Sequence, residues 1–120
     1  MAAFSAMGQS GASNENVFVK VEIHSGPDSI KLETYLNRSR LLTGSEWEGI
    51  PVGRYVVPIE LVVDIHGKPG RFKAVRPSDP RLYNRAVRLL KEYPGEWQPA
   101  SQCGRLVNSY WKYNIVFEVR

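Results

Sequence analysis

Apolar and polar residues alternate in two long segments of the chain, at residues 54–64 and 107–120. Successive side chains of a strand point to opposite faces, so each segment is predicted to be a strand with one apolar face. The apolar side chains are Tyr55, Val57, Ile59, Leu61 and Val63 in the first, and Trp111, Tyr113, Ile115, Phe117 and Val119 in the second. Pro58 has no N–H for a ladder, which predicts a sheet edge or a bulge there.

Two shorter segments complete the predicted sheet. Residues 17–23 alternate from Val17 to Ile23 and predict a first strand. Residues 71–75 follow a glycine-containing turn at 66–70, which predicts a strand that returns beside residues 54–64 as a hairpin.

Two further segments have the spacing of amphipathic helices. Asp28 or Ser29 is expected to cap a short helix that ends between residues 37 and 40. Asp79 is expected to cap a second helix with Pro80 at its first position, where a missing N–H is no loss. Its apolar stripe is Leu82, Ala86, Leu89, Leu90 and Tyr93, and Pro94 and Gly95 end it.

The glycine- and proline-containing segments 41–53 and 96–104 are predicted to be loops, with Trp47 as the large anchor of the first. The order is then strand, helix, strand, strand, helix, strand. This order predicts an α+β domain at residues 17–120, an antiparallel sheet with two helices packed on one face.

The first 16 residues form a separate region. Ala2 to Gly8 is mildly apolar and rich in small residues, and a polar stretch follows to Asn16. Ala6-Met7-Gly8 has the small-x-small form of a signal-peptidase site. Two interpretations stay open, the remnant of a signal peptide and a flexible tail without a targeting role. An intact Met1 in the native secreted protein, detected by mass spectrometry, would exclude the first.

Charge allows more partners than it excludes. The 120 residues carry a net charge of +4. A basic series at residues 71–91 would suit a phosphate-binding face: Arg71, Lys73, Arg76, Arg81, Arg85, Arg88 and Lys91. Recognition of RNA by a sheet needs aromatic residues on its exposed face. Most strand aromatics here fall on the buried face, so no nucleic-acid partner is expected.

Residues suited to catalysis are sparse and scattered. Cys103 is the sole cysteine and lies in a predicted turn, far in sequence from His24 and His66. Glu60 and Asp64 share the wet face of one strand, without two environments to separate their pKa values. The sequence holds no phosphate-binding loop and no zinc-protease or nucleophile-elbow motif. We therefore expect a binding module without catalytic residues, metal or cofactor.

An ordered series of motifs resembles the C-terminal domain family of TonB energy transducers, in the form common in the Bacteroidetes. It starts with the valine-rich run from Val57 to Lys68, which ends in an aspartate and a glycine turn. Arg76-Pro77-Ser78-Asp79-Pro80, the following helix, the W-x-P series of Trp97 and Pro99, Gly104, and the closing run from Tyr110 to Phe117 complete it. The resemblance covers residues 54–120 well and residues 17–42 more loosely. Leu41-Leu42-Thr43-Gly44 stands where the family has a tyrosine-proline pair.

The resemblance implies a fold, a place and a function. In the family, a receptor segment in the periplasm adds as a strand beside the last strand of the domain, in energy-coupled transport. The matching residues are Ile115, Val116, Phe117, Glu118 and Val119, and Trp97, Pro99 and Gly104 match structural positions of the family.

The expected partner is an outer-membrane receptor peptide or another periplasmic protein, with contact to a membrane only through partners or a missing anchor. No apolar run approaches the roughly 20 residues that span a bilayer, and the proline-rich spacer of a transducer is absent. The chain is then either a fragment of a transducer or a free-standing relative. The alternative function is a structural or adaptor domain of the same fold, possible as a homodimer through its edge, without a transport role.

Overall fold

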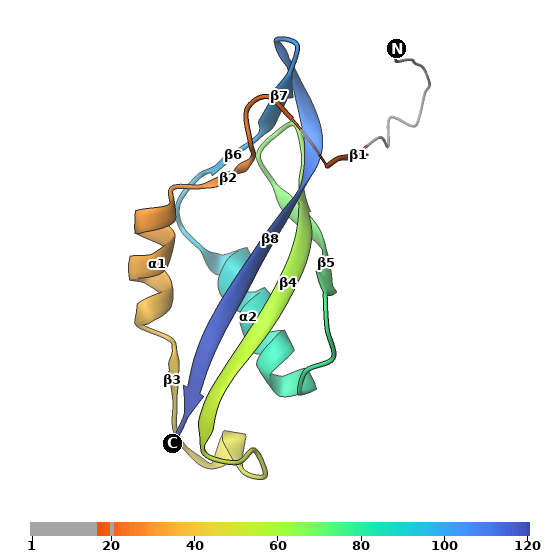
Figure 1. The fold of residues 1–120 in the computed structure, drawn as a ribbon. Helices are drawn as coiled ribbons and strands as arrows, with labels where there is room; N and C mark the ends of the chain where they lie inside the picture. The colour runs from red at the N-terminus through yellow and green to blue at the C-terminus, as the bar shows by residue number, and fades with distance from the viewer. Residues whose placement is uncertain (1–16, 20) are drawn as a thin grey trace.

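Two long antiparallel strands, β4 (Gly53–Val63) and β8 (Arg105–Val119), form the centre of the sheet in this computed structural model, which describes residues 17–19 and 21–120. They pair without a register shift from Gly53 with Val119 to Val63 with Ser109. β5 (Pro69–Ala74) pairs antiparallel with the other side of β4, which confirms the predicted hairpin (Figure 1).

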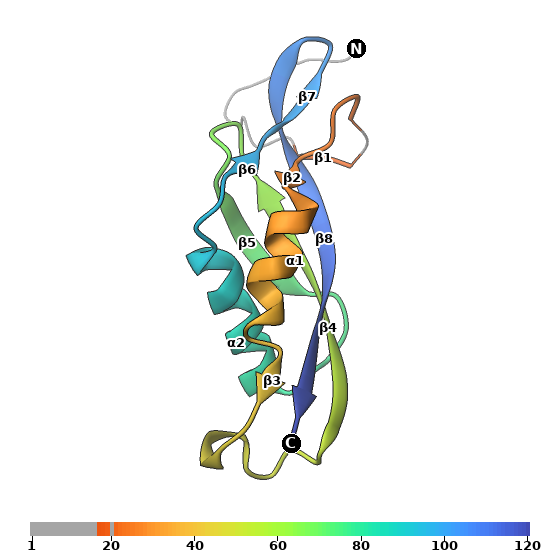
Figure 2. The ribbon, with the colours of Figure 1, turned by 90° about the vertical axis from the view of Figure 1, so that its left-hand side faces the viewer.

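The two predicted helices are confirmed as α1 (Ser29–Asn37) and α2 (Pro80–Glu92). Asp28 caps α1 and Asp79 caps α2, because each carboxylate accepts hydrogen bonds from amides of the first turn. Both helices lie on the same side of β4 and β8 (Figure 2). The core between the helices and the sheet includes Leu32, Leu36, Val57, Ile59, Leu61, Leu82, Leu90, Ile115 and Phe117. A multistranded sheet with two helices is compatible with the expected α+β class.

The expectation of a purely antiparallel sheet is wrong, because two short strands pair with β8 in parallel. β1 (Val17–Phe18) pairs with Asn108 and Ser109, and β3 (Leu41–Leu42) pairs with Glu118 and Val119. Along the chain, α1 lies between β1 and β3. Both short strands run parallel to β8 and pair with its opposite ends. The sheet is mixed.

The first predicted strand is much shorter than residues 17–23. The side chains of Val19 and Ile23 are 75% and 63% exposed, so they do not share a buried face with Val17. The chain leaves β8 after Phe18, and Ile23 instead exchanges two backbone hydrogen bonds with Ser101. Alternation was misleading here because the apolar positions have no core opposite them. Lys20 and the 1–16 segment, with its predicted signal-peptide remnant, lie outside the described residues.

Both predicted loops contain short regular elements. Residues 41–53 include β3 and a 3₁₀ turn at Ser45–Trp47, and the Trp47 side chain is buried as expected of an anchor. Residues 96–104 were wrongly predicted to be a loop. They form β6 (Trp97–Gln98), which pairs with β2 (Gly26–Pro27), and β7 (Ala100–Gln102), which forms a hairpin with β8.

Pro58 does not mark an edge strand, because β4 has a neighbour on each side. The Val75 N–H donates to the Pro58 carbonyl at 3.0 Å, so the polar groups of residue 58 face β5 and not β8. β5 itself pairs only from Ile59 onward. Pro58 therefore lacks its N–H at the end of the β4–β5 ladder, and all hydrogen bonds between β4 and β8 can still form. The bulge lies further along, where the register shifts between Glu60 and Val62.

The cap of α2 gives a first prediction. Hydrogen bonds from the backbone N–H and then the side chain of Arg81 hold the pKa of Asp79 below its ordinary value of 3.8. Asp79→Ala is expected to lower the free energy of unfolding by about 1 kcal/mol at pH 7. A carboxylate with a lowered folded-state pKa stabilises above its unfolded pKa, and this contribution disappears as the pH falls through the lowered value.

Urea unfolding from pH 7 down to pH 2 would measure the effect of this change. The difference between the native chain and Asp79→Ala should shrink below pH 4, while Asp79→Asn, an uncharged cap, should show a flatter pH dependence. A difference between the native chain and Asp79→Ala that stays constant over this range would contradict the assignment.

Candidate functional site

Among the described residues, the outer side of β8, away from β4, is paired only at its two ends. At the C-terminal end, the Glu118 N–H donates to the Arg40 carbonyl at 2.8 Å and the Arg120 N–H to the Leu42 carbonyl at 3.0 Å. At the other end β1 pairs with Asn108 and Ser109. Between them, no strand in the described part of the chain pairs with residues 110–117. We call this stretch the β8 gap; Figure 2 looks onto this edge of the sheet.

The backbone groups that face the gap follow from the regular ladder. In an antiparallel pair, every second residue turns both its N–H and its C=O away from the partner strand. Glu118 and Arg120 turn their N–H groups away from β4, and the register is unbroken back to Ser109. The outward groups within the gap therefore belong to Tyr110, Lys112, Asn114 and Val116. The Phe18–Ser109 pair of the parallel β1 ladder uses the Tyr110 N–H, which leaves the Tyr110 C=O and both groups of the other three residues for an added strand. Such a row of donors and acceptors is a template for another strand.

The predicted peptide site at residues 115–119 overlaps the gap only in part. The side chains of Ile115, Phe117 and Val119 are buried in the core at 0%, 0% and 3% exposure, and their backbone groups face β4. Glu118 faces outward but is already paired with β3. Val116 alone of the five lies in the gap with outward backbone groups. The candidate site thus shifts toward the N-terminal part of β8, because the two-residue strand β3 covers the end.

Side chains on both faces of β8 border the gap. On the helix-covered face, the half-buried rings of Trp111 and Tyr113 stack with their centroids 5.2 Å apart and an interplanar angle of 4°. On the opposite face, Tyr110 is exposed and Lys112 lies 3.9 Å from the Glu60 carboxylate across the strands. A strand added here would place alternate side chains beside aromatic rings and beside polar groups.

One end of the gap opens into a cavity of about 360 Å³ lined by Arg40, Arg54, Val116, Phe117 and Glu118. The Arg40 guanidinium forms an ion pair with Glu33 at 2.9 Å. Its Nε atom is buried and has no hydrogen-bond partner among the described residues. A buried donor of this kind favours an acceptor group beside it, such as a carbonyl of an added strand.

Trp97, Pro99 and Gly104 have structural places outside the gap. The Trp97 ring is buried between Tyr93 and Trp111, with centroids 6.3 and 4.9 Å away and near-perpendicular planes. Pro99 follows on the segment that packs on the Gly67 turn. Gly104 has φ 75° and follows Cys103 with φ 52° in the β7–β8 turn. Two left-handed residues in a two-residue hairpin turn are typical of a type I′ turn. This hairpin was missed in the sequence because its turn is Cys-Gly and not the usual Asn-Gly or Asp-Gly.

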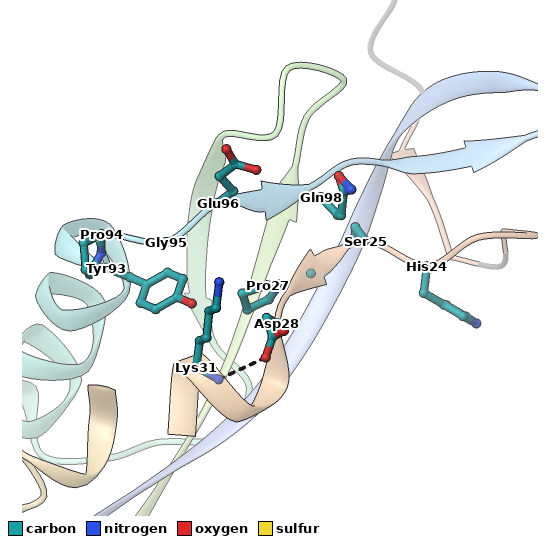
Figure 3. Close-up of a pocket in the computed structure, with 11 residues that line it drawn as sticks. His24, Ser25, Pro27, Asp28, Lys31, Tyr93, Pro94, Gly95, Glu96 and Gln98 are labelled. Carbon is teal, nitrogen blue, oxygen red and sulfur yellow. Dashed lines mark hydrogen bonds between the residues drawn. The ribbon is translucent and has the colours of Figure 1, made fainter. Parts of the chain in front are cut away.

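A separate pocket of about 670 Å³ lies between the start of α1 and the connection from α2 to β6. Tyr93 and Lys31 point toward the same space, whereas His24 and Glu96 point away from it (Figure 3). Burial, and secondarily the Asp28 carboxylate, raise the pKa of Tyr93 above its ordinary value of 10.0. Asp28 itself accepts from the Ile30 and Lys31 amides. The polar groups are therefore held in capping and packing roles, and we assign no chemistry to this pocket.

The other candidate residues are not brought together. Cys103 is exposed in the β7–β8 turn, and Asp64 accepts hydrogen bonds from the amides of His66 and Lys68 at 2.8 and 2.9 Å. Asp64 thus closes the β4–β5 turn. Within residues 17–19 and 21–120, no group of three or more histidine, cysteine, aspartate or glutamate side chains is placed to hold a metal ion.

Comparison with known proteins gives no match of any kind: no family model fits the chain, no curated protein matches it in sequence, and no solved structure matches it. Among the described residues, none of the helices is both long and apolar enough to cross a bilayer. The likeness to the TonB C-terminal family therefore rests on the motifs in the sequence alone.

Proposed function

We propose that the chain is a TonB-like binding module, not an enzyme, which takes an extended peptide into the β8 gap by strand addition. The observation that carries the proposal is the row of outward backbone groups at Lys112, Asn114 and Val116 with the Tyr110 C=O, bounded at both ends by short strands of the chain itself. An added strand has the same rise of about 3.3 Å per residue as β8, so the gap at residues 110–117 accommodates a segment of about eight residues.

The resemblance supplies the rest of the proposal. The partner is a periplasmic segment of an outer-membrane receptor, and the binding serves energy-coupled transport across the periplasm. The position of the gap supports this, since it lies on the strand that the family uses. The alternative is a structural or adaptor domain of the same fold without a transport role, which could form a homodimer if the β8 gaps of two copies pair with each other.

The proposal predicts that Asn114→Pro weakens peptide binding about tenfold or more, because proline removes an outward N–H and places ring carbons on the edge. The inward ladder to β4 keeps its hydrogen bonds, since residue 114 faces the gap. Asn114→Ala, which keeps the N–H, should bind like the native chain. An NMR titration with peptides from the periplasmic ends of outer-membrane receptors measures both.

A second probe avoids any change to the protein. Peptides that are N-methylated at alternate residues should lose binding in one methylation pattern and keep it in the other. Amide shifts concentrated at residues 110–117 would support the proposal. If no peptide shifts these amides at millimolar concentration, receptor binding is excluded; a dimer in sedimentation that Asn114→Pro dissociates would then favour the adaptor function.

A further inference from the structure

A second groove, of about 580 Å³, lies on the opposite edge of the sheet between β5 and α2. Its walls include Phe72 from β5 and Tyr83 from α2. Three cationic side chains line it: Arg71, Arg88 and Lys91. No acidic residue lines this groove in the part of the chain that the structure describes. The groove therefore combines an apolar floor with one sign of charge.

The strand beside the groove is the last of the sheet. β5 pairs only with β4 among the described strands. Because the Val75 N–H donates to Pro58 on β4, the neighbouring Ala74 turns its N–H and C=O to the outer side. Like the β8 gap, this edge can accept an added strand, but it is independent of that gap and of the function proposed for it.

Arg71 has an unusual backbone conformation at the middle of this edge. Its φ is 50°, in the left-handed region that residues other than glycine seldom adopt. It lies in the bulge where Arg71 and Phe72 oppose only Leu61 on β4. Bulges change the direction of side chains and are frequent at binding sites. Here the bulge places an arginine at the mouth of the groove.

We propose that the groove between β5 and α2 binds an acidic peptide segment in an extended conformation, which adds to the β5 edge. Its carboxylates contact Arg88 and Lys91, and its apolar side chains contact Phe72 and Tyr83. Opposite charge across the groove selects the partner, and backbone pairing with Ala74 sets its register.

The groove suits a peptide better than a nucleic acid. Single-stranded nucleic acids bind to exposed aromatic faces on which bases stack. The Phe72 ring is instead half-buried, with the Lys91 Nζ atom 5.5 Å from its centroid. A phosphate backbone supplies acceptors alone, so it can pair with the N–H groups of a sheet edge but not with its C=O groups, whereas a peptide pairs with both.

The test uses the full chain and a fluorescent, end-blocked peptide of sequence Glu-Thr-Val-Thr-Glu-Thr, which places both glutamates and the valine on one face of a strand, with the Gln-Thr-Val-Thr-Gln-Thr peptide as its uncharged match. We expect the glutamate peptide to bind about tenfold more tightly than the glutamine peptide, and to shift amides of β5 and α2 and not those of the β8 gap. Arg88→Glu should weaken binding about tenfold. Arg105→Glu, the same charge change in the distant β7–β8 hairpin, should have no effect.

The strand component has its own variant. Ala74→Pro removes the outward N–H of β5 and should abolish binding, while Ala74→Ser should retain it. Equal binding of the two peptides would overturn the proposal. So would a uridine oligonucleotide that binds more tightly than the glutamate peptide, competes with it and is insensitive to Ala74→Pro, since that result describes a phosphate-binding surface.

Discussion

Gly67→Ala is expected to lower the free energy of unfolding by about 3 kcal/mol. Gly67 has φ 74°, and a Cβ atom there would lie 2.3 Å from the Trp97 backbone carbonyl oxygen. Neither the turn nor the Trp97 backbone can shift without losing contacts. Asp64 holds the β4–β5 turn through the amides of His66 and Lys68, and the Trp97 side chain is buried in the core. Urea unfolding followed by circular dichroism measures the loss.

The matched control is Gly104→Ala. Gly104 has nearly the same φ, 75°, but among the described residues no atom beyond its two chain neighbours lies within 4 Å of a Cβ built there. It carries only the cost of the left-handed conformation, about 1 kcal/mol. The difference between the two variants then isolates the close approach of the turn to the Trp97 segment. Equal losses in both variants would show that this contact contributes nothing to stability.

Trp97→Ala is expected to cost about 4 kcal/mol, since it removes a large buried ring from a chain of edge-to-face contacts. Tyr35, Tyr93, Trp97 and Trp111 follow one another in this chain, with centroids 5.2, 6.3 and 4.9 Å apart. Tyr35 also joins the two helices, because its hydroxyl donates to the Leu89 carbonyl at 2.9 Å. Losing Trp97 therefore loosens the packing of α1, α2 and β8 together.

Unfolding in urea and near-ultraviolet circular dichroism would measure the change. Trp97→Phe should recover about half of the lost stability, because it refills part of the volume. Tyr110→Ala, which removes an exposed aromatic from the other face of β8, should cost less than about 1 kcal/mol. A small loss for Trp97→Ala would contradict the packing role assigned to this ring.

Long periodic segments made the main elements predictable. β4 and β8 alternate over many residues against one core, and α2 has both a capped start and an apolar stripe. Elements of two or three residues, such as β3 and β7, are too short to show a period and depend on their partner strands. Residues 17–23 show the opposite case. They alternate clearly in the sequence, but only Val17 and Phe18 pair with another strand of the sheet.

The same limit applies to the candidate site. The residues indicate that β8 is the strand with an available edge, and the resemblance indicates its C-terminal part. Which section of the edge stays unpaired depends on where β1 and β3 attach, and neither Val17 nor Leu41 signals its partner in the sequence. The Gly67–Trp97 contact was equally hidden, although both residues belong to the motifs that carry the resemblance.

The pairing pattern of β8 has a consequence for the order of folding. Val17 pairs with Asn108 and Gly53 pairs with Val119. Four strands in the described part of the chain, β1, β3, β4 and β7, thus pair with β8, which is synthesised after all of them. An emerging chain can form the β4–β5 hairpin and the helices early, but one long edge of β4 stays bare until residues 105–119 are available. Contacts so distant in sequence slow folding, which exposes the unfinished sheet to aggregation or chaperones in the meantime.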